Sequence, residues 1–226
     1  DAVSGSDPFG FKPECGARLG VMPRNGSNSD IKWIEINPCF VFHPMNAYEE
    51  NEKIILHVCR QNKAMVGGMD EIYGGEDTTG KIWKWTINLT SGTCSEEQID
   101  DRPCDFARVD DRLVGLKAKN GYAMALNEKA ETLTFDQYLY KFDLENNKRF
   151  DHNLGDNVFG GEPVFVPKSG SSSEDDGWVM AIVYDANIDK SKLIIVDTEN
   201  FDKKPVGEII LPQRVPFGAH GSWLSN

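Results

Sequence analysis

The segment Trp178–Val196, WVMAIVYDANIDKSKLIIV, contains the pattern that decides the fold class. Its two apolar runs, Trp178–Tyr184 and Leu193–Val196, are rich in β-branched and aromatic residues, which favour extended strands. Between them lies Asp185–Asp189, where Asp and Asn side chains can bond to the local backbone and tolerate left-handed geometry. The segment therefore predicts a β-hairpin.

Short apolar runs of this kind recur along the chain, and no long amphipathic helix is predicted between them. Further strands are expected at Ile31–Ile36, Ile54–Cys59, Lys81–Asn88, Gly121–Leu126 and Gln137–Asp143. An all-β chain with repeated hairpins is typical of a sandwich, a barrel or a propeller. Because one propeller blade needs roughly 40–50 residues, a chain of this length has room for about five blades at most.

The composition argues against several classes of function. The net charge is −12 and no cluster of Lys and Arg suits phosphate groups, so we expect no nucleic-acid partner. No apolar run reaches about 18 residues, so the sequence predicts no membrane-spanning helix. The five cysteines form no C-x-x-C pair, which argues against a disulfide framework or a zinc knuckle.

Reduced cysteines are typical of an intracellular protein, and the chain begins at Asp1 with no signal-peptide pattern. We therefore expect a cytoplasmic protein, or a plastid protein if its source is a photosynthetic eukaryote. The first residue is not Met, which predicts a truncated or processed product.

Two of the four histidines lie in settings that suit a metal ligand. His43 follows an apolar run, and Pro44 keeps it extended, so its imidazole is expected at the end of a strand. His220 lies between Gly218 and Gly221, where the backbone can approach closely or adopt unusual dihedral angles. Taken alone, each histidine also fits a structural residue or a tight turn.

Three other polar residues need an interpretation. His57 lies within an apolar run and His152 in a polar connection, so both are predicted to be structural or exposed. Glu162 lies among glycine and apolar residues, where a carboxylate is costly to bury unless it is paired. The ring N–H of a metal-bound imidazole would be such a partner, and a place in a surface loop is the alternative.

Four segments together resemble the carotenoid cleavage oxygenase family, which also includes stilbene-cleaving dioxygenases and a retinoid isomerohydrolase. The segments are Arg18–Arg24 (RLGVMPR), Phe42–Glu49 (FHPMNAYE), Gly161–Pro167 (GEPVFVP) and Arg214–Gly221 (RVPFGAHG). They occur in the family's order and spacing, and the resemblance extends from about Phe11 to Leu224.

The resemblance implies a seven-bladed β-propeller with iron(II) on its axis, bound by four histidines, three of which hydrogen-bond to glutamates. Neutral imidazole suits iron(II), and open coordination positions leave room for O2. Carried over residue by residue, the resemblance makes His43 and His220 iron ligands and Glu162 the hydrogen-bond acceptor behind one imidazole.

One segment departs from the family's pattern. The family has a glutamate followed by Phe, Pro and Arg, whereas Cys104–Val109 reads CDFARV. Asp105 then takes the place of the glutamate with a side chain shorter by one methylene, and Ala107 takes that of the proline. Phe42 and Phe106 are implied walls of an apolar substrate tunnel, or else residues of the core.

The function implied is that of an iron(II) dioxygenase, which adds O2 across a conjugated C=C bond of a carotenoid or apocarotenoid to give two carbonyl products. Residues 1–226 would be the C-terminal part of a single propeller domain whose N-terminal half, with the other two histidines, is absent. This part alone is expected to be inactive.

Three alternatives stay open. The first is a stilbene-type (lignostilbene) dioxygenase, and the second is an isomerase or hydrolase on the same scaffold. The third is a metal-free propeller that acts as a binding module, in which His43 and His220 would not converge. A peripheral contact with a membrane is also left open.

Overall fold

The computed structural model describes residues 11–64, 78–127, 129 and 135–224. Its strands are β1 Ala17–Val21, β2 Lys32–Ile36, β3 Phe40–Glu50, β4 Lys53–Gln61, β5 Lys81–Asn88, β6 Thr93–Arg108, β7 Asn120–Leu126, β8 Phe135–Asp143, β9 Lys148–Asn153, β10 Val158–Phe159, β11 Val164–Pro167, β12 Gly177–Asp185, β13 Lys190–Asp197 and β14 Gly207–Ile210. The helices of this described part are single 3-10 turns, η2 Pro13–Cys15, η3 Asn28–Asp30 and η5 Asp111–Leu113. None of them has the length and apolar character needed to cross a membrane. The all-β prediction is confirmed.

The hairpin predicted from Trp178–Val196 is confirmed as β12 and β13. The two strands pair antiparallel from Trp178↔Asp197 to Asp185↔Lys190. At the turn, Asp189 has a φ of 51°, in the left-handed region that Asp tolerates, and its carboxylate accepts a hydrogen bond from the Tyr184 hydroxyl. The other predicted strands are also present, as β2, β4, β5, β7 and β8.

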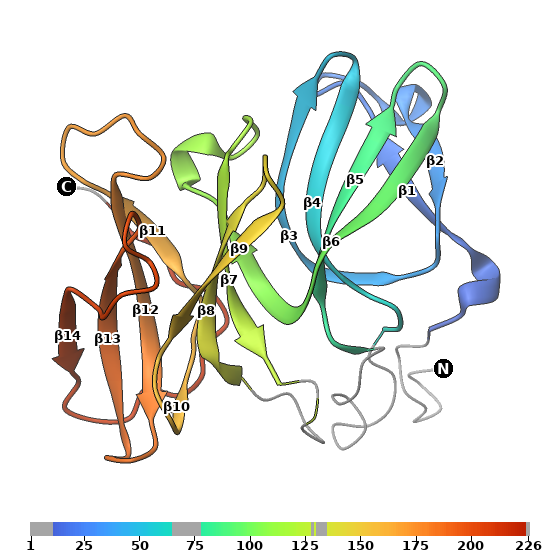
Figure 1. The fold of residues 1–226 in the computed structure, drawn as a ribbon. Coiled ribbons are helices and arrows are strands. Elements are labelled where there is room, and N and C mark those ends of the chain that lie inside the picture. The colour runs from blue at the N-terminus through green and yellow to red at the C-terminus, as the bar shows by residue number, and fades with distance from the viewer. Residues whose placement is uncertain (1–10, 65–77, 128, 130–134, 225–226) are drawn as a thin grey trace.

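The long strand β6 joins two groups of strands into one path of order β3-β4-β5-β6-β7-β8-β9. Its N-terminal part pairs with β5 as far as Lys81↔Pro103, and its C-terminal part pairs with β7 from Cys104↔Ala125 onward. A third group, β10 to β14, forms a separate sheet around β12 and β13. Figure 1 shows the three groups beside one another, with β3–β6 on the right, β7–β9 in the middle and β10–β14 on the left.

Strand β7 lies between the two main cores, and all seven of its residues are buried. Ala123 and Ala125 belong to the core shared with β4–β6, whereas Tyr122 and Met124 belong to the core shared with β12 and β13. This alternation follows from the two-residue period of a strand, and burying a side chain such as Met124 stabilises the fold by about 1.5–3 kcal/mol. The middle group is thus held firmly by both of its neighbours.

Candidate metal centre

His43 lies inside β3, not at the strand end that the sequence predicts. The pairing of β3 with β4 shifts register on both sides of Pro44, because proline has no backbone N–H to give to the ladder. Such an irregularity redirects side chains, and the imidazole of His43 is partly buried, with 21% of the side chain exposed.

Asp105 on β6 accepts a hydrogen bond from His43. The distance from Nδ1 of His43 to Oδ1 of Asp105 is 2.9 Å, so the shorter side chain reaches the imidazole directly. The same Oδ1 accepts the backbone N–H of Phe106 at 2.8 Å. The bond to Asp105 raises the pKa of His43, while partial burial acts in the opposite direction. Asp105 therefore holds the proton on Nδ1 and leaves the Nε2 lone pair of His43 free.

Glu162 plays the same part for His220. It lies between β10 and β11, and its Oε1 is 3.0 Å from Nδ1 of His220. Its Oε2 accepts the backbone N–H of Gly221 at 2.6 Å. The Glu162 side chain is 8% exposed and pairs with the imidazole of His220, while its place behind a metal-bound imidazole stays a prediction.

The structure brings the two histidines together although they are far apart in the sequence. The ring centroids of His43 and His220 are 5.0 Å apart, with an angle of 79° between the rings. The ring of Phe106 stacks on His43 at 4.5 Å and lies 5.5 Å from His220. The convergence contradicts what a metal-free binding module predicts for these histidines.

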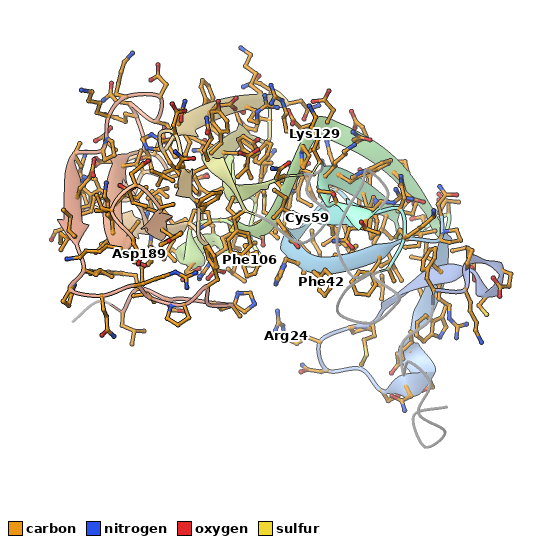
Figure 2. All side chains as sticks on the ribbon, turned by 90° about the horizontal axis from the view of Figure 1, so that it is seen from below. Arg24, Phe42, Cys59, Phe106, Lys129 and Asp189 are labelled. Atoms are coloured by element: carbon orange, nitrogen blue, oxygen red, sulfur yellow. The ribbon has the colours of Figure 1, made fainter. Side chains whose placement is uncertain are left out.

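Phe106 has a backbone φ of 53°, which a residue with a bulky side chain rarely adopts. It lies where the pairing of β6 with β7 shifts register, between Asp105 and Arg108. Strained backbone of this kind costs on the order of 1–3 kcal/mol and is concentrated at functional sites. Phe42 is 38% exposed, and Figure 2 labels both phenylalanines near the middle of the molecule.

His57 and His152 are each only 1% exposed, so the prediction that they are structural holds and the exposed alternative is wrong. His152 lies in β9 and not in a connection, and its Nδ1 is 2.9 Å from the carbonyl oxygen of Phe201. Burial lowers the pKa of His57 to about 4.

A cavity of about 380 Å³ adjoins His220. It is mostly apolar, and its walls include Phe106, Met124, Phe135, Met180, Phe217 and Trp223, with Glu162 and His220 at the polar side. Phe106 thus faces a cavity as the tunnel prediction requires. Phe42 is not among the lining residues, and its place in a tunnel stays a prediction.

Among the described residues, no group of three or more His, Cys, Asp or Glu side chains is arranged to hold a metal ion. The pair of imidazoles nevertheless has the donor chemistry of a partial site, because each Nδ1 is engaged by a carboxylate. Carboxylates behind imidazoles are the usual partners of metal-bound histidine. The residues present therefore fit iron(II) as two of its ligands.

The site also contains a residue to which the sequence assigns no role. The guanidinium of Arg108 donates to the carbonyl oxygen of Gly221 and lies 3.5 Å from Oε1 of Glu162. Its signal was its place three residues after Asp105, at the arginine of the family's Glu-Phe-Pro-Arg pattern.

A family model described as Retinal pigment epithelial membrane protein matches residues 2–225. A Carotenoid cleavage oxygenase of Mycobacterium tuberculosis is 34% identical to the chain, covering 96% of the chain and 44% of the relative. The chain belongs to the carotenoid cleavage oxygenase family. Another member, the Apocarotenoid-15,15'-oxygenase of Synechocystis, is 31% identical over 94% of the chain and 44% of its own length.

Solved structures of the family agree with the fold. A cobalt-substituted Synechocystis ACO superposes with a TM-score of 0.82 at 30% identity, covering 96% of the chain and 46% of that structure. An ACO/RPE65 chimera gives a TM-score of 0.81 at 28% identity. The predicted β-propeller architecture is confirmed, and the chain spans less than half the length of these relatives.

Proposed function

We propose that the protein containing this chain is a non-heme iron(II) dioxygenase that cleaves one conjugated C=C bond of a carotenoid or apocarotenoid. Both atoms of O2 enter the products, one in each new C=O group, so the reaction needs no other reductant. The relatives' names support this reaction class, since they are carotenoid and apocarotenoid oxygenases.

The observation that carries the proposal is the convergence of His43 and His220, each backed by a carboxylate. Asp105 and Glu162 fix the tautomer in which each Nε2 lone pair is free. Bound iron(II) would supply the activation of O2. Two imidazoles do not complete an iron site, so further ligands have to come from outside the described residues.

The cavity supports the class of substrate. Its walls are mostly apolar and it adjoins His220, so it can bind a conjugated hydrocarbon chain, exclude water and orient one bond toward the histidines. The cobalt-substituted Synechocystis ACO further supports a metal ion in this fold. Stilbene cleavage, isomerisation and hydrolysis differ from the proposal in their products.

The test uses the full-length protein loaded with iron(II). It is incubated under ¹⁸O2 with a carotenoid, an apocarotenoid or a stilbene, and the carbonyl products are identified by mass spectrometry. We expect ¹⁸O in both products from a carotenoid-type substrate. His43→Ala and His220→Ala are expected to abolish turnover, whereas His57→Leu is the matched control and should retain it. No turnover on any substrate, despite bound iron, would contradict the proposal.

A further inference from the structure

Arg108, at the end of β6, contacts the Glu162–His220 side of the candidate metal centre. Its guanidinium donates to the carbonyl oxygen of Gly221 and to both carboxylate oxygens of Asp111, at 3.0 and 3.1 Å. It also lies 3.5 Å from Oε1 of Glu162, the atom that accepts from His220. The Arg108 and Glu162 side chains are 18% and 8% exposed, so this ion pair is largely shielded from solvent.

The segment that carries His220 needs such an anchor. None of the described residues after β14 belongs to a strand, so no sheet ladder fixes them. Ser191 holds this segment at Val215, whose backbone N–H donates to the Ser191 hydroxyl at 2.9 Å. Phe217 then packs edge-on against Phe135 at 4.8 Å. Beyond Phe217, the next polar contacts are those that Glu162 and Arg108 make with His220 and Gly221.

Charge explains why the anchor is a cation. Glu162 is 8% exposed and accepts two N–H groups, from His220 and Gly221. A shielded carboxylate is costly unless an opposite charge accompanies it, and Arg108 is the cation next to it. The planar guanidinium also serves several acceptors in fixed directions, which an ammonium group cannot do.

We propose that Arg108 is a positioning residue for the metal centre: it holds the Gly221 carbonyl and the Glu162 carboxylate so that the imidazole of His220 stays directed toward His43. This inference rests on the proposed function. Arg108 is not among the residues that line the cavity, so it acts through Glu162 and the backbone at Gly221, without touching substrate.

The test compares Arg108→Met with Arg149→Met in the full-length protein. Arg149 is a matched control, because its side chain is 16% exposed and it also pairs with two carboxylates, those of Asp100 and Asp151, but it lies on β9 and makes no contact with His43, His220 or Glu162 among the interactions of the described residues. Three quantities are measured: hydrogen–deuterium exchange of residues 214–224 in the metal-free protein, the rate of metal release to a chelator, and kcat and KM.

In Arg108→Met we expect faster exchange in residues 214–224, metal release about 10-fold faster and kcat about 10-fold lower, with KM unchanged. Arg108→Lys should show smaller changes in metal release and kcat than Arg108→Met, since lysine keeps the positive charge but lacks the planar N–H donors of the guanidinium. Arg149→Met should match the wild type in all three. A merely structural role would lower the melting temperature without changing metal release in the folded protein.

Wild-type exchange of residues 214–224 in Arg108→Met overturns the inference whether or not the protein binds iron. Metal release and kcat in Arg108→Met that equal those of the wild type overturn it as well. If the unmutated protein itself binds no iron or shows no turnover, that result counts against the proposed function instead. If Arg108→Met does not fold, Asp111→Ala decides. The Asp111 side chain is 51% exposed and orients Arg108. Hydrogen–deuterium exchange of residues 214–224 and metal release in Asp111→Ala that equal those of the wild type would therefore also overturn the inference.

Discussion

Lowering the pH from 7 to 4 should destabilise the sheet around His57 by about 3 kcal/mol. His57 on β4 is 1% exposed, and burial, followed by the charge of Lys84, lowers its pKa from 6.5 to about 4. Among the described residues neither ring nitrogen has a hydrogen-bond partner, so nothing compensates for a proton there. Since one pKa unit corresponds to about 1.4 kcal/mol, the difference of about 2.5 units amounts to about 3.5 kcal/mol in full. At pH 4 the folded site is about half protonated, so about 3 kcal/mol of this is lost.

The sign follows from the direction of the pKa change. Between pH 6.5 and pH 4 the unfolded chain binds a proton at His57 and the folded chain does not, so stability falls as the pH falls through this window. His43 acts in the opposite direction. Asp105 raises its pKa, so in the metal-free protein its contribution is present below the unfolded value and is lost as the pH rises through the folded one.

The assay is urea unfolding of the metal-free protein at pH 7, 5.5 and 4, followed by tryptophan fluorescence. Trp83 and Trp85 on β5 lie opposite Val58 and Leu56, beside His57, and report on this sheet. The comparison is with His57→Leu, which removes the titrating group and leaves His43 and the carboxylates in place. Equal losses in the two proteins between pH 7 and pH 4 would refute the reasoning.

Three further outcomes are expected from the site and the core. Glu162→Gln keeps the shape of the side chain but loses its charge and one acceptor, so metal binding should weaken about 10–100-fold in a chelator competition, and wild-type affinity would contradict the hydrogen bond to His220 as a tuning contact. Gly161→Ala places a Cβ onto the carbonyl oxygen of Ile182, so the backbone next to Glu162 must move. We expect weaker metal binding together with a lower melting temperature. A variant with wild-type values of both would show that the loop accommodates the Cβ without moving Glu162. Met124→Ala, at 1% exposure between the second and third strand groups, should cost about 2–5 kcal/mol in urea unfolding, and a loss below about 1 kcal/mol would mean that the core refills.

Much of the fold could be predicted because buried strands carry an apolar signal of their own. The segments of β7, β12 and β13 contain the short apolar runs Gly121–Leu126, Trp178–Tyr184 and Leu193–Val196, which favour strands. The first ten residues of β6, TCSEEQIDDR, have no such signal, since none of them is fully buried. The sequence therefore does not predict β6, and so it does not predict that β3–β5 and β7–β9 are joined in one path.

The site could be predicted in part. His43, His220 and Glu162 each fit an ordinary structural residue when taken alone, and the family resemblance was what paired them. The contact of Asp105 with His43 was harder to predict, because the aspartate side chain is one methylene shorter than that of glutamate. The structure shows that it reaches His43 directly, at a place where the register of β6 shifts and Phe106 adopts a left-handed φ. Strand periodicity cannot reveal such a local shift.

The two imidazole–carboxylate pairs differ in how they are supported, and this difference makes Arg108 matter. His43 and Asp105 both lie on strands whose ladders hold them, and their side chains are 21% and 8% exposed. The imidazole of His220 is 57% exposed, and it lies on a segment without a sheet partner. The free energy that fixes this second imidazole must therefore come from side-chain contacts: the rings of His43 and Phe106, and the polar contacts of Glu162 and Arg108. Sheet pairing thus fixes the His43–Asp105 side of the centre, whereas side-chain contacts, the charge pair of Glu162 and Arg108 among them, fix the His220 side.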